Sequence, residues 1–258
     1  MPRSFRRSAF VCAALTFVAT LAVPVAAAPK PVVTVFAAAS LREAFEAARP
    51  EFTRRTGYPV RFNFGGSDML AAQLQQGAPA DAFASANEQQ MTRVAALVEN
   101  TKVFARNRLV LIASAASPVH AIADLAKSGT KVVVAATSVP VGAYGRLALT
   151  NLDKMPGYPP DFDKRVLANV VSEETDVKAV ATKVALGEAD AGIVYATDVT
   201  QQIAPKVHVL RFPPDAAPDA TYPIATVKGA SNADGGRAFV EFITSSAGAA
   251  YLHARGFE

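Results

Sequence analysis

Short apolar runs alternate with amphipathic stretches along the chain, and the first such pair shows the pattern. Val32–Phe36 is a β-branched and aromatic run, which is typical of a strand buried on both faces. After a turn of alanines, Leu41, Phe45, Ala48 and Phe52 recur at helical spacing and form one apolar face. This stretch therefore predicts a buried strand that leads into an amphipathic helix.

The same alternation predicts the remaining elements. Further strands are expected at Tyr58–Phe64, Asp81–Ala86, Leu109–Ala113, Val132–Ala135, Val166–Val171, Ala191–Tyr195, Val207–Leu210 and Tyr222–Val227. Helices are expected after Gly66 and Pro118, and at Glu88–Val98, Gly142–Leu152, Val177–Val184 and Gly236–Ala250. Because strands and helices alternate, we expect an α/β protein whose sheets are mainly parallel.

The strand–helix units fall into two clusters, which indicates two lobes. The clusters lie before and after the apolar run at 109–113. The last strand and helix need a sheet to join, and the first lobe offers an edge for them. We therefore expect residues 28–113 with 221–258 to form the first lobe and 114–220 the second, with a cleft between them.

The N-terminus has the organisation of a secretory signal peptide. Arg3, Arg6 and Arg7 precede an uncharged apolar run at 9–23, which ends in small residues. This run is shorter than the roughly 20 residues that span a membrane. We expect residues 1–27 to be removed and the protein to be exported to the periplasm.

Removal of the signal changes the cysteine content and the charge. Cys12, the one cysteine of the chain, lies within it, so the stability of the mature protein must come from its core. Without the three arginines of the signal the net charge falls from +4 to +1. A near-neutral chain argues against a nucleic-acid partner.

The sequence lacks the usual motifs of enzymes and metal sites. Residues 65–69 read Gly-Gly-Ser-Asp-Met and so lack the last glycine of a nucleophile elbow. The three histidines, His120, His208 and His253, lie away from the predicted turns, which argues against a Ser-His-Asp triad. No cysteine pair, histidine pair or EF-hand spacing occurs. We expect no enzyme, no cofactor and no metal-cation ligands.

Several predicted helices begin at turns of small residues that would favour an anion. These starts are Ser40, Ser67, the turn Ser138–Gly142 and the turn Thr175–Val177, while Tyr195 ends a strand. Helix N-termini have free N–H groups and a partial positive charge. Serine and tyrosine hydroxyls add neutral donors. Such a set of donors suits a compact, fully ionised oxyanion.

Each of these residues also has a purely structural interpretation. Ser40 and Glu43 fit the S-x-x-E capping box, and a serine at a helix start is commonly a cap. Asp68 follows Ser67 and is expected to face solvent as a first-turn carboxylate. If Asp68 faced the ligand instead, it would repel a dianion or accept a proton from a protonated one.

Five short motifs occur in order along the chain: Val35–Leu41, Gly77–Asp81, Asn107–Leu111, Val139–Gly142 and Gly192–Asp198. In these motifs, and over nearly all of 30–258, the sequence resembles the periplasmic molybdate-binding proteins of ABC importers. The resemblance implies the type II, venus-flytrap fold of periplasmic binding proteins, in which a ligand lies between two lobes.

The resemblance also implies a ligand set. Members of this family hold the oxyanion with two serines, two backbone N–H groups and a tyrosine, and the matching positions are Ser40, Ser67, Val141, Val177 and Tyr195. We accordingly expect molybdate or tungstate as the ligand, the permease of an ABC importer as the partner, and a monomer. A receptor for sulfate or phosphate, or an enzyme acting on an anionic substrate in the cleft, remains the alternative.

Overall fold

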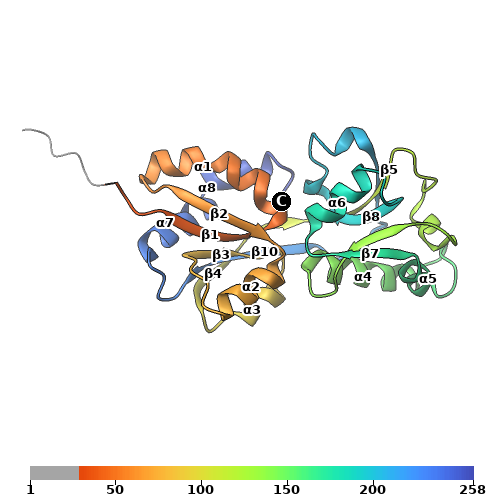
Figure 1. The fold of residues 1–258 in the computed structure, drawn as a ribbon, viewed down its shortest axis with the longest axis horizontal. Helices are drawn as coiled ribbons and strands as arrows, with labels where there is room; N and C mark the ends of the chain where they lie inside the picture. The colour runs from red at the N-terminus through yellow and green to blue at the C-terminus, as the bar shows by residue number, and fades with distance from the viewer. Residues whose placement is uncertain (1–28) are drawn as a thin grey trace, which may run out of the picture.

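The computed structural model describes residues 29–258, and in it the chain forms two lobes, each built on its own five-stranded sheet (Figure 1). The expected signal peptide, residues 1–27, lies outside the described residues. Within 29–258, none of the helices has the length and apolar character needed to cross a membrane.

The first sheet has the strand order β2-β1-β3-β10-β4. β1 pairs in parallel with β2 and β3, whereas β10 runs antiparallel to β3 and β4. The strands are β1 Val33–Ala38, β2 Val60–Gly65, β3 Ala82–Ala84, β4 Val98–Asn107 and β10 Ala220–Val227. The helices are η1 Ala39–Leu41, α1 Arg42–Thr56, α2 Ser67–Gln75, α3 Glu88–Arg93, α7 Ala233–Thr244 and α8 Ser246–His253.

The second sheet has the strand order β7-β6-β8-β5-β9. β6 pairs in parallel with β7 and β8, whereas β5 runs antiparallel to β8 and β9. The strands are β5 Leu109–Ser114, β6 Val132–Ala135, β7 Val170–Glu174, β8 Ala191–Tyr195 and β9 Val207–Arg211. The helices are η2 Ile122–Ala126, α4 Pro140–Leu152, α5 Phe162–Ala168, α6 Val177–Ala185, η3 Ala196–Asp198 and η4 Ala204–Lys206.

The chain passes twice between the sheets, after β4 and after β9. These crossings lie side by side, because Asn107 at the end of β4 pairs with Ala220 at the start of β10. The α/β fold with two sheets is confirmed, and each sheet is mixed. Residues 109–113, which were expected in the first lobe, pair in the second sheet as β5. A fully apolar strand does not reveal by its pattern which of two sheets it joins.

Three of the expected elements were wrong. The helix expected at Glu88–Val98 ends with α3, and β4 begins at Val98. The strand expected at Val166–Val171 is the end of α5 followed by β7, because short apolar runs fit both periods. The single helix expected at Gly236–Ala250 is broken at Ser245, whose hydroxyl accepts from the Gly248 N–H and caps α8.

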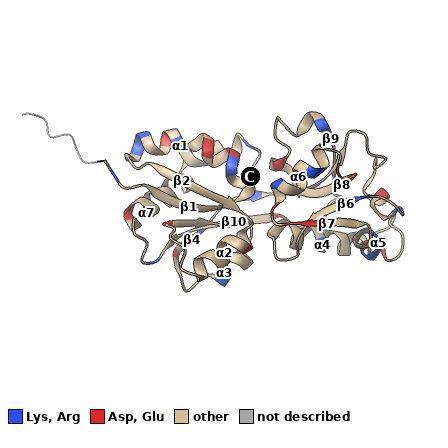
Figure 2. Cartoon of the chain, viewed as in Figure 1, with Lys and Arg blue, Asp and Glu red and all other residues tan. Residues whose placement is uncertain are grey.

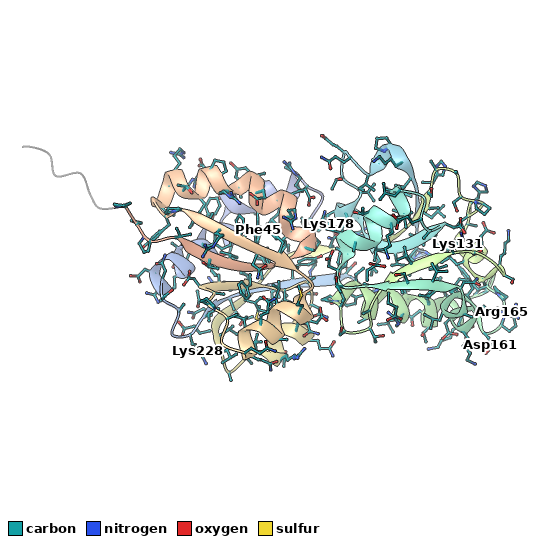
Figure 3. All side chains as sticks on the ribbon, viewed as in Figure 1. Phe45, Lys131, Asp161, Arg165, Lys178 and Lys228 are labelled. Carbon is teal, nitrogen blue, oxygen red and sulfur yellow. The ribbon has the colours of Figure 1, made fainter. Side chains whose placement is uncertain are left out.

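Aromatic packing holds the helices of the first lobe to its sheet. Phe239 of α7 lies 5.3 Å, centroid to centroid, from both Phe45 and Phe52 of α1. It also lies 5.7 Å from Phe62 of β2. Phe239 is 1% exposed, and the label of Phe45 marks the cluster beneath α1 in Figure 3. One ring therefore joins two helices to a strand.

Phe239→Ala should lower the free energy of unfolding by about 3–5 kcal/mol, because it leaves a cavity among packed rings. Leu186→Ala is the control, since Leu186 is 61% exposed and its truncation should change stability by less than about 0.5 kcal/mol. Urea denaturation of both variants measures the difference. Equal losses in the two variants would contradict the importance of the aromatic cluster.

Candidate functional site

The five candidate ligand residues line a single small cavity between the lobes. Ser40 and Ser67 come from the first lobe, and Val141, Val177 and Tyr195 come from the second. All five are buried, with exposed fractions of 1% to 4%. The space open to the centre of a water-sized sphere is about 10 Å³, so the cavity suits one compact group and no extended ligand.

The two serines of the first lobe are not helix caps. Ser40 lies within η1, where no side chain caps the helix, and its Oγ is 2.9 Å from Tyr222 Oη. The capping box expected at Ser40 is therefore wrong. Ser67 is the first residue of α2, and its Oγ accepts a hydrogen bond of 3.0 Å from the Ala86 N–H. Both hydroxyls are held by groups outside their own helices and line the cavity.

Two helix N-termini of the second lobe meet at the same cavity. Val141 and Val177 lie in the first turns of α4 and α6, where N–H groups have no partner inside the helix. Asp176 Oδ1 accepts from the N–H groups of Lys178 and Ala179 at 2.8 and 3.1 Å. The carboxylate thus caps α6, and the Val177 N–H remains for the cavity.

Close backbone packing places the start of α4. A Cβ added to Gly142 would lie 2.1 Å from the Ala136 carbonyl oxygen, which follows β6. Only a glycine allows this approach, and it puts the first turn of α4 over the end of the strand. The requirement explains the glycine of the Val139–Gly142 motif.

Tyr195 brings a phenol to the cavity. It ends β8 and is 1% exposed, and its Oη has no hydrogen-bond partner among residues 29–258. Burial raises the pKa of Tyr195 well above its ordinary value, and the neighbouring Tyr222 raises it further. The phenol therefore stays protonated. An unpaired buried donor costs about 1–3 kcal/mol, which an acceptor on a ligand would remove.

A partly buried ion cluster beside the cavity joins the lobes. Lys178 Nζ of α6 lies 2.7 Å from Glu43 Oε2 of α1 and 3.0 Å from Asp198 Oδ1 of η3. Asp198 Oδ2 also accepts from the Tyr195 N–H at 3.3 Å. Figure 3 shows Lys178 at the junction of the lobes. No pattern in the sequence predicted this cluster, although Asp198 belongs to the Gly192–Asp198 motif.

Burial and charge oppose each other in this cluster. Burial raises the pKa of Asp198 to about 6, while the positive charge of Lys178 acts to lower it. Burial alone would lower the pKa of Lys178, but Asp198 and Glu43 together raise it above its ordinary value. Lys178 therefore remains charged and holds Glu43 of the opposite lobe.

Further contacts close the cleft beside α2. Ser138 Oγ of the second lobe donates to Asp68 Oδ2 at 2.6 Å, and Gln90 Nε2 donates to the Ser138 carbonyl at 3.0 Å. A Cβ on Gly66 would lie 2.4 Å from the Thr175 carbonyl oxygen across the cleft. Asp68 was expected to face solvent, and this is wrong, because it accepts a hydrogen bond from the other lobe.

The arrangement supplies hydrogen-bond donors and little else. Among the described residues that line the cavity, none is Lys, Arg or His, and the carboxylate of Asp176 is engaged by α6. Acidic and basic residues are interspersed over both lobes (Figure 2). Within 29–258 no group of three His, Cys, Asp or Glu side chains could hold a metal ion. Two hydroxyls, a phenol and first-turn N–H groups can together surround the oxygens of one small anion.

Residues 33–258 match the model of the bacterial extracellular solute-binding protein family. The molybdate-binding protein ModA of Mycobacterium bovis is 40% identical over 231 residues, covering 87% of this chain and 84% of that protein. That of Haemophilus influenzae is 35% identical over 240 residues, covering 87% and 89%.

One solved structure supports the fold. The periplasmic molybdate-binding protein of Azotobacter vinelandii superposes with a TM-score of 0.74 and is 23% identical, covering 88% of this chain and 98% of that one. At this identity the likeness shows the two-lobed fold alone.

Gly66→Ala should weaken anion binding by about tenfold or more, because its Cβ would meet the Thr175 carbonyl and hold the lobes apart. Gly145→Ala is the matched control, since its Cβ would lie 3.4 Å from the Ile193 side chain, an ordinary contact. Calorimetric titration with an oxyanion measures affinity, and small-angle scattering measures closure. Unchanged affinity in Gly66→Ala would show that the lobes bind without this close approach.

Asp198 should make stability depend on pH. Its pKa is raised above the value of 3.8 for an ordinary aspartate. Its contribution to the free energy of unfolding is therefore fully present below about pH 4 and is lost as the pH rises through about 6. Asp198→Asn cannot ionise, so it should gain stability relative to the wild type as the pH rises from about 4 to 7.5. Denaturation at both pH values measures this, with the exposed Asp219→Asn as control. Parallel pH profiles for Asp198→Asn and the wild type would contradict it.

Proposed function

The chain belongs to the molybdate-binding members of the bacterial extracellular solute-binding proteins, and from this premise we propose that it is a periplasmic receptor for molybdate and tungstate. It binds and does not catalyse. The receptor encloses the oxyanion between its lobes and delivers it to the membrane permease of an ABC importer. The proposal extends to the export route, in which residues 1–27 are cleaved as a signal peptide.

The observation that carries the proposal is the convergence of donors from both lobes on one cavity. Ser40 and Ser67 would donate through their hydroxyls, Val141 and Val177 through backbone N–H groups, and Tyr195 through its phenol. A tetrahedral dianion can accept from all five, since it carries four oxygens and no hydrogen. Neither lobe alone supplies the full set, so the ligand favours the closed form.

Closure also gives the permease something to recognise. The contacts Glu43–Lys178 and Asp68–Ser138 join the lobes on either side of the cavity. They form only when the lobes approach, so the loaded receptor presents one continuous surface. A partner that binds this surface would select loaded over empty receptor by the difference in closure.

Molybdate at about 100 times its dissociation constant should raise the free energy of unfolding by about 2.7 kcal/mol. Ser40→Ala and Tyr195→Phe should each weaken molybdate binding by about 1–3 kcal/mol, because each leaves a ligand oxygen without a donor. The exposed Ser128→Ala should leave binding unchanged. Thermal shift and calorimetry with molybdate, tungstate, sulfate and phosphate measure both effects.

Two outcomes would contradict the proposal. A melting temperature unchanged by every one of these anions would exclude an oxyanion receptor. Tighter binding of sulfate or phosphate than of molybdate would keep the receptor but change its ligand.

A further inference from the structure

A chain of buried hydrogen bonds lies behind Ser40. Asn107 Nδ2 is 3.4 Å from Tyr222 Oη and 2.8 Å from Thr197 Oγ1, and Tyr222 Oη is 2.9 Å from Ser40 Oγ. Asn107, Tyr222 and Ser40 are 1%, 0% and 2% exposed. Ser40 lines the cavity, whereas Tyr222 and Asn107 stand behind it. These hydrogen bonds connect the ligand site to β4 and β10, the strands that border the crossings between the lobes.

Each group in this series of hydrogen bonds donates to the next, from Asn107 through Tyr222 to Ser40. The Arg108 N–H donates to Asn107 Oδ1 at 3.0 Å, which turns the amide NH₂ group toward Tyr222. An amide N–H can only donate, so the Tyr222 oxygen accepts. Ser40 Oγ is the other hydrogen-bond partner of Tyr222 Oη among the described residues, and since Asn107 already donates to that oxygen, we assign the Tyr222 hydrogen to Ser40 Oγ. The Ser40 hydrogen cannot then point back at Tyr222 and faces the cavity.

The hydroxyl of Ser67 is also directed as a donor, but by a backbone group. The Ala86 backbone N–H donates to Ser67 Oγ at 3.0 Å, so Ser67 also directs its hydrogen elsewhere. Burial keeps the Tyr195 phenol protonated. The backbone sets the direction of the Ser67 hydroxyl, whereas side chains set that of Ser40, so substitution can change it.

We propose that Tyr222 and Asn107 are positioning residues that fix Ser40 as a donor and so make the site reject a tetrahedral dianion that carries a proton. This inference rests on the proposed function. Molybdate and hydrogen phosphate carry the same charge at about pH 8, but hydrogen phosphate has one O–H group that needs an acceptor. With both serine hydroxyls directed as donors, an O–H of the ligand that faces either of them meets a hydrogen, and the unpaired group lowers affinity.

Asn107→Asp tests the direction of the hydrogen bonds that run from Asn107 to Ser40. The carboxylate keeps the shape of the amide but can only accept, so the Tyr222 hydrogen turns to it and the Tyr222 oxygen accepts from Ser40. Ser40 then presents lone pairs to the cavity. We expect the ratio of phosphate to molybdate affinity to rise by about tenfold or more relative to the wild type. The added negative charge repels both dianions alike, so a change in the ratio of phosphate to molybdate affinity reports the effect of the proton that phosphate carries.

Tyr222→Phe provides a second test that keeps the buried ring. It removes the hydrogen that constrains Ser40, so the ratio should move in the same direction by a smaller factor. Tyr158→Phe is the matched control. Tyr158 packs edge-on against Phe162 at 4.9 Å, as Tyr222 does against Phe257 at 5.3 Å, but among the described residues it has no hydrogen bond to a residue that lines the cavity. Sulfate, a dianion without a proton, should follow molybdate in every variant.

Calorimetric titrations of the four proteins at about pH 8 separate the outcomes. Equal losses of phosphate and molybdate affinity, or a ratio unchanged in both Asn107→Asp and Tyr222→Phe, would overturn the inference, and so would an equal shift in Tyr158→Phe. If sulfate binds and molybdate does not, the proposed ligand fails, and the phosphate-to-sulfate ratio tests the same inference. A wild type that binds no oxyanion overturns both proposals.

Discussion

Hydrogen-bond donors buried without acceptors of their own set the constraint on which the rest of this structure depends. The Tyr195 phenol lies buried with no partner among the described residues, and first-turn N–H groups of α4 and α6 line the same cavity. Each unpaired donor costs more free energy than a typical hydrogen bond contributes. The closed arrangement is therefore stabilised by a ligand rich in acceptors, and the donors come from both lobes so that closure and binding are coupled.

Charged side chains near the cavity have partners of their own and leave the ligand contacts to neutral groups. Lys178 pairs with Glu43 and Asp198, and Asp176 is engaged by the N–H groups of α6. A free cation at the centre would attract anions of many shapes and protonation states. Fixed neutral donors act only over hydrogen-bonding distances and in defined directions, so they discriminate by the geometry and hydrogens of the ligand.

The connectivity of the chain places these groups. β5 and β10, the reversed strands of the two sheets, each follow directly after a crossing between lobes. The crossings are adjacent, and β10 carries Tyr222 into contact with Ser40 while β4 ends at Asn107. The strands that border the two crossings therefore also hold the side chains that orient one of the ligand donors.

The sequence by itself determined the strand–helix alternation and the candidate donors, because apolar periodicity and small-residue turns are local properties of the chain. It missed the break at Ser245 and misassigned β5, since local pattern does not specify which surface an apolar segment packs on. The sequence also did not reveal which residues form hydrogen bonds with the candidate donors. Tyr222 lies 182 residues from Ser40, and Asp68 meets Ser138 across the cleft. Only the folded chain brings such residues within hydrogen-bonding distance, so tertiary structure alone decided the direction of the Ser40 hydroxyl and the contacts that close the lobes.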